Sequence, residues 1–105
     1  MMKEVNDSTF YNEVSVAETP VVVDFWAPWC GPCKMVSPVL ESLEKDYGSK
    51  VKFVKINVDE STVISQRYKI SSIPTIMIFD KGITTETLVG FRPRQAFEDA
   101  IKKYI

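Results

Sequence analysis

The sequence predicts an α/β fold with a central mixed sheet of four to five strands flanked by about four helices. Two patterns lead to this prediction. Apolar segments of strand length alternate with segments whose apolar residues recur at helical spacing, and the last two strands are separated by a tight-turn sequence at 80–82. Strands joined through helices run parallel, whereas a hairpin joins antiparallel strands, so the sheet is mixed. We expect residues 1–105 to form a single domain, because this length suits one hydrophobic core.

The first elements are a short helix and a buried strand. Asp7 or Ser8 could cap a helix that carries Phe10 and Val14 on one face. The segment 21–26 is almost continuously apolar, which is typical of a strand covered on both faces.

A long helix follows over about 32–47, and Gly48 is expected to end it in a left-handed cap. The next elements are a strand over 52–58 and a short helix over about 60–68. In the strand, the expected face pattern places Phe53 opposite three aliphatic residues, Val54, Ile56 and Val58.

The chain ends in a hairpin and a helix. Strands are predicted over 75–79 and 84–89, joined by a tight turn at 80–82. A final helix over about 94–104 has one apolar stripe, formed by Phe97, Ala100, Ile101 and Tyr104.

Composition excludes several classes of function. The net charge is −1 with no long run of either sign, which argues against a nucleic-acid or membrane-surface partner. The chain has no histidine, which removes Ser–His and Cys–His catalysis and histidine metal sites, and two cysteines alone do not make a zinc site. Its four scattered glycines form no phosphate-binding motif, so we expect no bound metal or nucleotide cofactor.

The N-terminal residues 1–7 carry charges and lack the apolar core of a signal peptide, and no apolar stretch approaches the ~20 residues of a membrane span. We therefore expect a cytoplasmic protein that works as a monomer. In a reducing compartment, a lone Cys-x-x-Cys pair is more often catalytic than structural.

The two cysteines form the sequence Cys30-Gly31-Pro32-Cys33 directly after the predicted buried strand. Residues three apart on a helical turn have Cα atoms about 5 to 6 Å apart, which allows a disulfide. Pro32 suits the first helical turn, so Cys30 falls at the helix N-terminus, where free N–H groups favour a thiolate. With Lys34 adding positive charge, we predict a pKa below about 8.5 for Cys30, which attacks, while the shielded Cys33 resolves the mixed disulfide.

Asp24 is the one charged residue of the segment 21–26. Burial should raise its pKa and allow it to exchange a proton with Cys33, although an aspartate that merely faces water is the alternative. Lys55 in the neighbouring strand could lie near Asp24 and moderate the shift, or could face solvent.

Pro74 and the two tryptophans are further residues expected to be near the cysteines or next to them in the sequence. Pro74 opens a strand, either as a simple boundary or with a cis bond that exposes the backbone of Ile73 to an extended peptide. Trp29 is expected to form a wall of the site, and Trp26 to lie in the core.

These residues together resemble the thioredoxin family over nearly the whole chain. The resemblance is carried by the run from Val23 to Lys34 and by Pro38, Lys55, Asp59, the run from Ile73 to Thr75, Phe79, Gly82 and Gly90. It implies the thioredoxin fold and a cytoplasmic protein-disulfide reductase whose redox-active group is the Cys30–Cys33 disulfide, with Asp24 and Lys55 managing the proton.

The resemblance also implies the surface and the partners. Oxidised proteins would dock on a shallow apolar surface formed by Trp29, Gly31, Pro32, Ile73, Pro74 and Gly90. A thioredoxin reductase, either an NADPH-dependent flavoprotein or a ferredoxin-linked enzyme, would recharge the dithiol, so NADPH and FAD would belong to that partner. Pro28, Ser72 and Phe91 depart from the common family pattern and are expected to affect partner preference.

Two other functions remain open. A disulfide oxidase or isomerase generally carries other residues between its cysteines, so Gly31-Pro32 favours a reductase. A non-catalytic interaction or scaffold subunit would keep its function without either cysteine.

Overall fold

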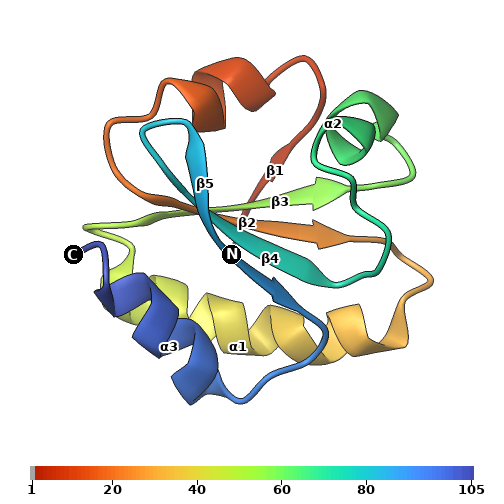
Figure 1. Cartoon of the computed structure of the whole chain (residues 1–105). Coiled ribbons are helices and arrows are strands. Elements are labelled where there is room, and N and C mark those ends of the chain that lie inside the picture. The colour runs from red at the N-terminus through yellow and green to blue at the C-terminus, as the bar shows by residue number, and fades with distance from the viewer. Residues whose placement is uncertain (1) are drawn as a thin grey trace.

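The computed structural model describes residues 2–105, and within them the predicted mixed α/β architecture is confirmed (Figure 1). No helix in that range is long and apolar enough to cross a membrane. The elements in chain order are β1 (Lys3–Val5), η1 (Tyr11–Ser15, a π-helical turn), β2 (Val21–Trp26), α1 (Gly31–Tyr47), β3 (Lys52–Asn57), α2 (Thr62–Arg67), β4 (Thr75–Asp80), β5 (Ile83–Val89) and α3 (Arg94–Lys102).

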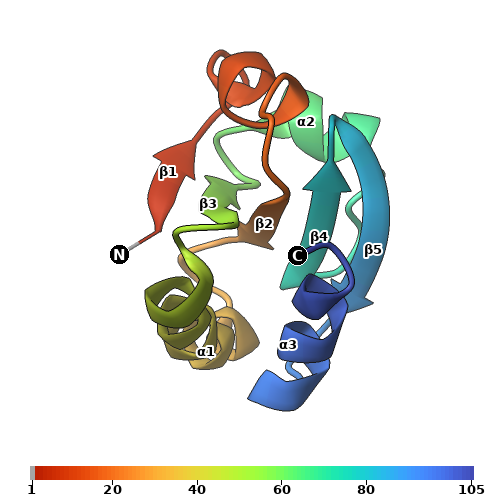
Figure 2. The ribbon, with the colours of Figure 1, turned by 90° about the vertical axis from the view of Figure 1, so that its left-hand side faces the viewer.

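The five strands lie in the order β1-β3-β2-β4-β5. The strands β1, β3 and β2 are mutually parallel, whereas β4 is antiparallel to both β2 and β5. Helices α1 and α3 cover one face of the sheet, and η1 and α2 cover the other (Figure 2). This arrangement makes β2 a central strand, and α1 begins just beyond its C-terminal end.

Each face of the sheet has its own hydrophobic core, as the strand patterns require. Phe53 packs with Val36 and Leu40 of α1 on one side. Val54 and Ile56 belong to the cluster on the other side, with Phe10 and Val14. Full burial of such a side chain contributes about 1.5 to 3 kcal/mol, so the alternation fixes which face of β3 meets α1.

The predicted hairpin between β4 and β5 is confirmed. Lys81 and Gly82 have φ values of 53° and 82°, which is the pair of positive φ angles that a type I′ turn requires. A Cβ atom at Gly82 would come within 2.6 Å of the Ser15 carbonyl oxygen, so space as well as backbone conformation requires glycine here.

Two local predictions are wrong. Neither Asp7 nor Ser8 caps the first helical segment: the side chain of Asn6 accepts hydrogen bonds from the N–H groups of Ser8 and Thr9. The C-cap Gly48 has a φ of −61°, in the right-handed region, because its N–H simply continues the helical pattern to the Glu44 carbonyl. The prediction also passed over β1, whose three residues pair with β3.

Candidate active site

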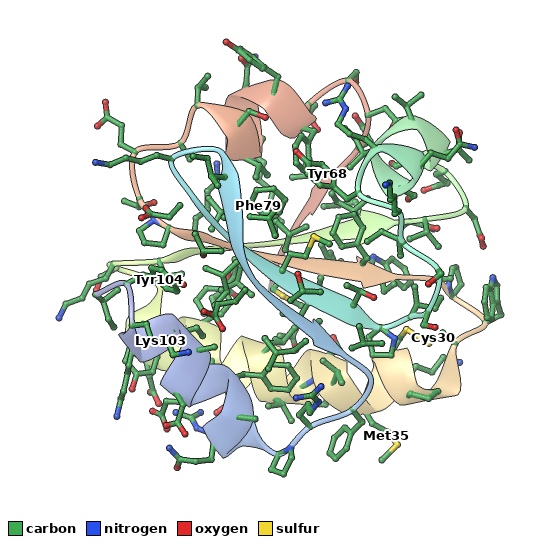
Figure 3. The ribbon with its side chains drawn as sticks, viewed as in Figure 1. Cys30, Met35, Tyr68, Phe79, Lys103 and Tyr104 are labelled. Carbon is green, nitrogen blue, oxygen red and sulfur yellow. A yellow bond between two sulfur atoms is a disulfide. The ribbon has the colours of Figure 1, made fainter. Side chains whose placement is uncertain are left out.

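The two cysteines lie at the end of the sheet, where α1 begins (Figure 3). Cys30 is the N-cap of α1, with an extended backbone, and its sulfur accepts a hydrogen bond from the Cys33 N–H at 3.2 Å. The pair forms a disulfide with a Cα–Cα distance of 5.3 Å, within the range that the spacing predicts. Pro32 lies in the first helical turn, where a missing N–H costs no hydrogen bond.

Both cysteines are nearly buried in this disulfide-bonded form, with 4% of Cys30 and 3% of Cys33 exposed. Exposure therefore does not distinguish the attacking sulfur from the resolving one. Their places in the helix differ, because the Cys30 sulfur accepts the Cys33 N–H of the first turn, and the positive end of the helix dipole stabilises negative charge there.

Asp24 is buried in the middle of β2, as predicted. Its Oδ1 atom has no hydrogen-bond partner within residues 2–105. Loss of hydration raises the pKa of Asp24 to about 7, while the charge of Lys55 lowers it and that of Glu4 raises it further. Lys55 is the direct register partner of Asp24 on β3, so the predicted proximity of these two residues is confirmed.

A cleft of about 320 Å³ connects this carboxyl with Cys33. It is lined by Asp24, Trp26, Ala27, Pro28, Cys33, Lys34, Ser37 and Lys55. Three predicted site residues therefore line the same cleft: Asp24, Cys33 and Lys55. Ser37 was missed by the sequence analysis, although its spacing of four residues from Cys33 would place both on the same helix face.

The two tryptophans differ in their surroundings. Trp29 is 69% exposed and its indole N–H donates to the Asp59 carboxylate at 2.9 Å, consistent with a wall residue. Trp26, which we expected in the core, is only half-buried because it is the last residue of β2 and lines the cleft. Its indole N–H donates to Glu4 at 3.3 Å.

The peptide bond between Ile73 and Pro74 is cis, one of the two alternatives that the sequence left open. Ile73 packs against the cluster of Ala27, Cys30 and Cys33, and the Pro74 carbonyl accepts a hydrogen bond from the Gly90 N–H at 2.8 Å. Gly90 has a φ of 86°, which a residue with a side chain rarely adopts. The structure therefore gathers Ile73, Pro74 and Gly90 in one place beside the disulfide.

Gly31 and Pro32 are both exposed at the start of α1, with nothing within 4 Å of a Cβ atom added at Gly31. Among residues 2–105, no group of three or more Cys, Asp or Glu side chains is arranged to hold a metal ion.

Comparison with known proteins gives matches along almost the entire chain. The sequence model of the thioredoxin family, described as "Thioredoxin", matches residues 1–103. A thioredoxin of Porphyra purpurea is 47% identical over 104 residues, covering 99% of this chain and 97% of the relative. Thioredoxin 1 of Nostoc is 45% identical over 102 residues, covering 97% and 95%. The chloroplastic M-type thioredoxin of Spinacia oleracea is 44% identical over 104 residues, 99% of this chain but only 58% of that relative.

Proposed function

Because the chain belongs to the thioredoxin family, we propose that it reduces disulfide bonds of cytoplasmic proteins, with Cys30 attacking and Cys33 resolving. Family membership and the Cys30–Cys33 disulfide make it a dithiol–disulfide oxidoreductase with protein-disulfide reductase activity. The observation that carries the assignment of roles is the hydrogen bond from the Cys33 N–H to the Cys30 sulfur at the helix N-terminus.

The proposed reaction has two displacement steps. In the reduced protein, the Cys30 thiolate attacks one sulfur of a substrate disulfide, which forms a mixed disulfide and releases the first substrate thiolate. Cys33 then loses its proton and attacks the Cys30 sulfur, which forms the Cys30–Cys33 disulfide and releases the second thiolate. Two electrons pass to the substrate, and its two sulfurs become thiols by taking up two protons.

Asp24 is the proposed acceptor of the Cys33 proton. It lines the same cleft as Cys33, and burial brings its pKa to about 7, close to the pH at which a base works best near neutrality. The Lys55 charge opposes the effect of burial and keeps part of the Asp24 population ionised. When the disulfide is reduced again, protonated Asp24 returns the proton to Cys33.

The proposed docking surface for oxidised proteins surrounds the disulfide. Trp29 is largely exposed, and Ile73 packs against the cluster that contains both cysteines. An extended substrate segment could pair with the backbone of Ile73, and apolar substrate side chains would gain contact with this surface. Its members are Trp29, Gly31, Pro32, Ile73, Pro74 and Gly90.

The partner that restores the dithiol is proposed to be a thioredoxin reductase, which would carry the nicotinamide and flavin or receive electrons from ferredoxin. The cytoplasmic location is also a proposal, which rests on the need of a disulfide reductase for a reducing compartment. Trapping of thiols in intact cells should find the Cys30–Cys33 pair mainly reduced, and a mainly oxidised pair would contradict this location.

The test of the function is reduction of insulin disulfides with dithiothreitol as the electron donor. The native chain should accelerate the reaction, and Cys30→Ser should reduce the rate to that of dithiothreitol alone. Cys33→Ser should instead accumulate a mixed disulfide through Cys30. No acceleration by the native chain, or a mixed disulfide trapped through Cys33 in the Cys30→Ser variant, would refute the proposed reaction. A biological function that survives replacement of both cysteines by serine would favour a scaffold role.

A further inference from the structure

Strand β1 places a third charged side chain next to the Asp24–Lys55 pair. Glu4 is the register partner of Lys55 on one side, and Asp24 is its register partner on the other. The strands β1, β3 and β2 lie side by side, so these residues form one row across the sheet (Figure 1). The row faces α1, because the alternate residues Val54 and Ile56 pack on the opposite face.

Trp26 contacts Glu4 at one end of this row and Lys55 in its middle. Its indole N–H donates to Glu4 Oε2 at 3.3 Å, and the Lys55 ammonium lies 4.9 Å from the ring centroid. An ammonium over an indole face is attracted by the ring, and it is also attracted by a carboxylate held at the ring edge. The Lys55 ammonium is therefore drawn toward Trp26 and Glu4 as well as toward Asp24.

We propose that Glu4 is a positioning residue for the dithiol reaction, which holds Trp26 and draws the Lys55 ammonium away from Asp24. This inference rests on the proposed role of Asp24 and adds the residue that adjusts it. Glu4 touches neither sulfur nor substrate, and it acts through Lys55 and Trp26.

The groups around Asp24 come from three other elements, and Glu4 is the acidic residue whose charge acts on Asp24. Lys55 faces it from β3, Cys33, Lys34 and Ser37 share its cleft from α1, and its partner on β4 is the apolar Ile76. Burial and the charge of Glu4 both raise the pKa of Asp24, whereas the charge of Lys55 lowers it. Removing the Glu4 charge should therefore favour the ionised form of Asp24.

The direct test is an NMR titration of the Asp24 carboxyl carbon in the oxidised protein, comparing the native chain with Glu4→Gln. We expect the pKa of Asp24 to fall by about 0.5 pH unit, because Glu4 is exposed and its charge is partly screened by water and salt. Glu4→Lys should give a larger fall. Glu18→Gln, at an exposed position outside the site, is the matched control and should leave the titration unchanged.

A second variant separates the route through Lys55 from a general effect of charge. In a Lys55→Met background, Glu4→Gln should shift the Asp24 titration by less than half as much as in the native chain. An undiminished shift would mean that Glu4 acts by its charge alone, and no shift in the native background would overturn the proposal.

The reaction supplies a further readout. Glu4→Gln should move the pH profile of insulin reduction to lower pH by about the same amount as the titration, and it should have no such effect in an Asp24→Asn background. If the titration moves but Asp24→Asn leaves the rate unchanged, the proposed catalytic role of Asp24 fails while the coupling to Glu4 stands. A pH profile that Glu4→Gln moves equally in both backgrounds would refute the route through Asp24.

Discussion

The indole N–H of Trp29 donates a hydrogen bond to the Asp59 carboxylate at 2.9 Å, which ties the residue before Cys30 to the segment that follows β3. The tryptophan is otherwise largely exposed, so this hydrogen bond limits the orientations that it can adopt beside the disulfide. A side chain held in one orientation loses less conformational entropy when a substrate docks on it.

Replacing Asp59 by alanine should therefore weaken protein docking and leave the thiol chemistry intact. We expect KM for insulin to rise about two- to fivefold, corresponding to a loss of about 0.5 to 1 kcal/mol, with little change in the rate toward a small-molecule disulfide. The Trp29 indole proton resonance should shift in the NMR spectrum. Glu60→Ala, at the next residue, is the control, and an unchanged KM with a shifted resonance would remove this hydrogen bond from substrate binding.

The raised pKa of Asp24 should make the free energy of unfolding of the oxidised protein depend on pH. This pKa rises from 3.8 to about 7 on folding, because burial disfavours the carboxylate. Between about pH 4 and pH 7 the unfolded chain has released this proton while the folded chain retains it, so the contribution of Asp24 to stability decreases as the pH rises and is constant above about pH 8. The shift corresponds to a loss of up to roughly 4 kcal/mol.

Asp24→Asn should abolish this loss, because the amide has no proton to release. In urea unfolding with the disulfide intact, the variant should gain up to roughly 4 kcal/mol relative to the native chain between pH 4 and pH 8. Glu60→Gln serves as the exposed control. A constant stability difference between the variant and the native chain across this range would show that the folded and unfolded pKa values of Asp24 are alike.

Much of this site could be predicted from the sequence because its signals are local. The spacing of Cys30 and Cys33 fixes their separation on one helical turn. Asp24 interrupts an apolar run, which favours a buried carboxyl over one that faces water. The hairpin turn is likewise local, since Lys81 and Gly82 determine the backbone conformation between β4 and β5.

The features that were missed depend on contacts between distant segments. Two of the three residues of β1 are charged, so no alternation marks it as a strand, and its pairing with β3 makes it one. The prediction for Trp26 also failed because of a tertiary contact. Its place in an apolar run predicts a core residue, but it lies at the end of β2 and lines the cleft. Asn and Asp are equally good capping residues, so the sequence does not show which of Asn6 and Asp7 caps the first helical segment. The tertiary position of α2 decides this, because it brings the N-terminus of α2 to Asp7.

The Asp7 carboxylate caps α2 from 56 and 57 residues away. It accepts hydrogen bonds from the N–H groups of Val63 at 3.2 Å and Ile64 at 2.9 Å. The residue at the N-cap position, Ser61, makes no side-chain capping bond. Asp7 therefore supplies the acceptor that the first turn of α2 needs, and its negative charge suits the N-terminal end of a helix.

Asp7→Ala should lower the free energy of unfolding by about 1 kcal/mol, which corresponds to a fall of roughly 4 to 8 °C in Tm for a chain of this size. Asp7→Asn should retain most of the stability, since the amide oxygen can still accept these bonds. Thermal unfolding measures both variants. Equal losses in the two variants would mean that the charge rather than the hydrogen bonds stabilises α2, and no loss in either would remove this capping contribution.

Phe91 should affect the choice of protein substrates. It follows Gly90, whose N–H donates to the Pro74 carbonyl, and 46% of its side chain is exposed. An aromatic side chain next to Gly90 would extend the proposed docking surface, and burying it against a substrate would remove apolar area from water.

Phe91→Ala should raise KM about three- to tenfold for a peptide disulfide with large apolar residues next to the target cysteine. It should have little effect on the same peptide with serine at those positions, and kcat should change little for either. Ile83→Ala is the matched control, because Ile83 is an exposed apolar residue (68%) at the opposite end of β5 from Gly90. Equal changes in KM for the two peptides would show that Phe91 does not discriminate between them, because a side chain that contacts the apolar residues must lose more binding energy with the peptide that carries them.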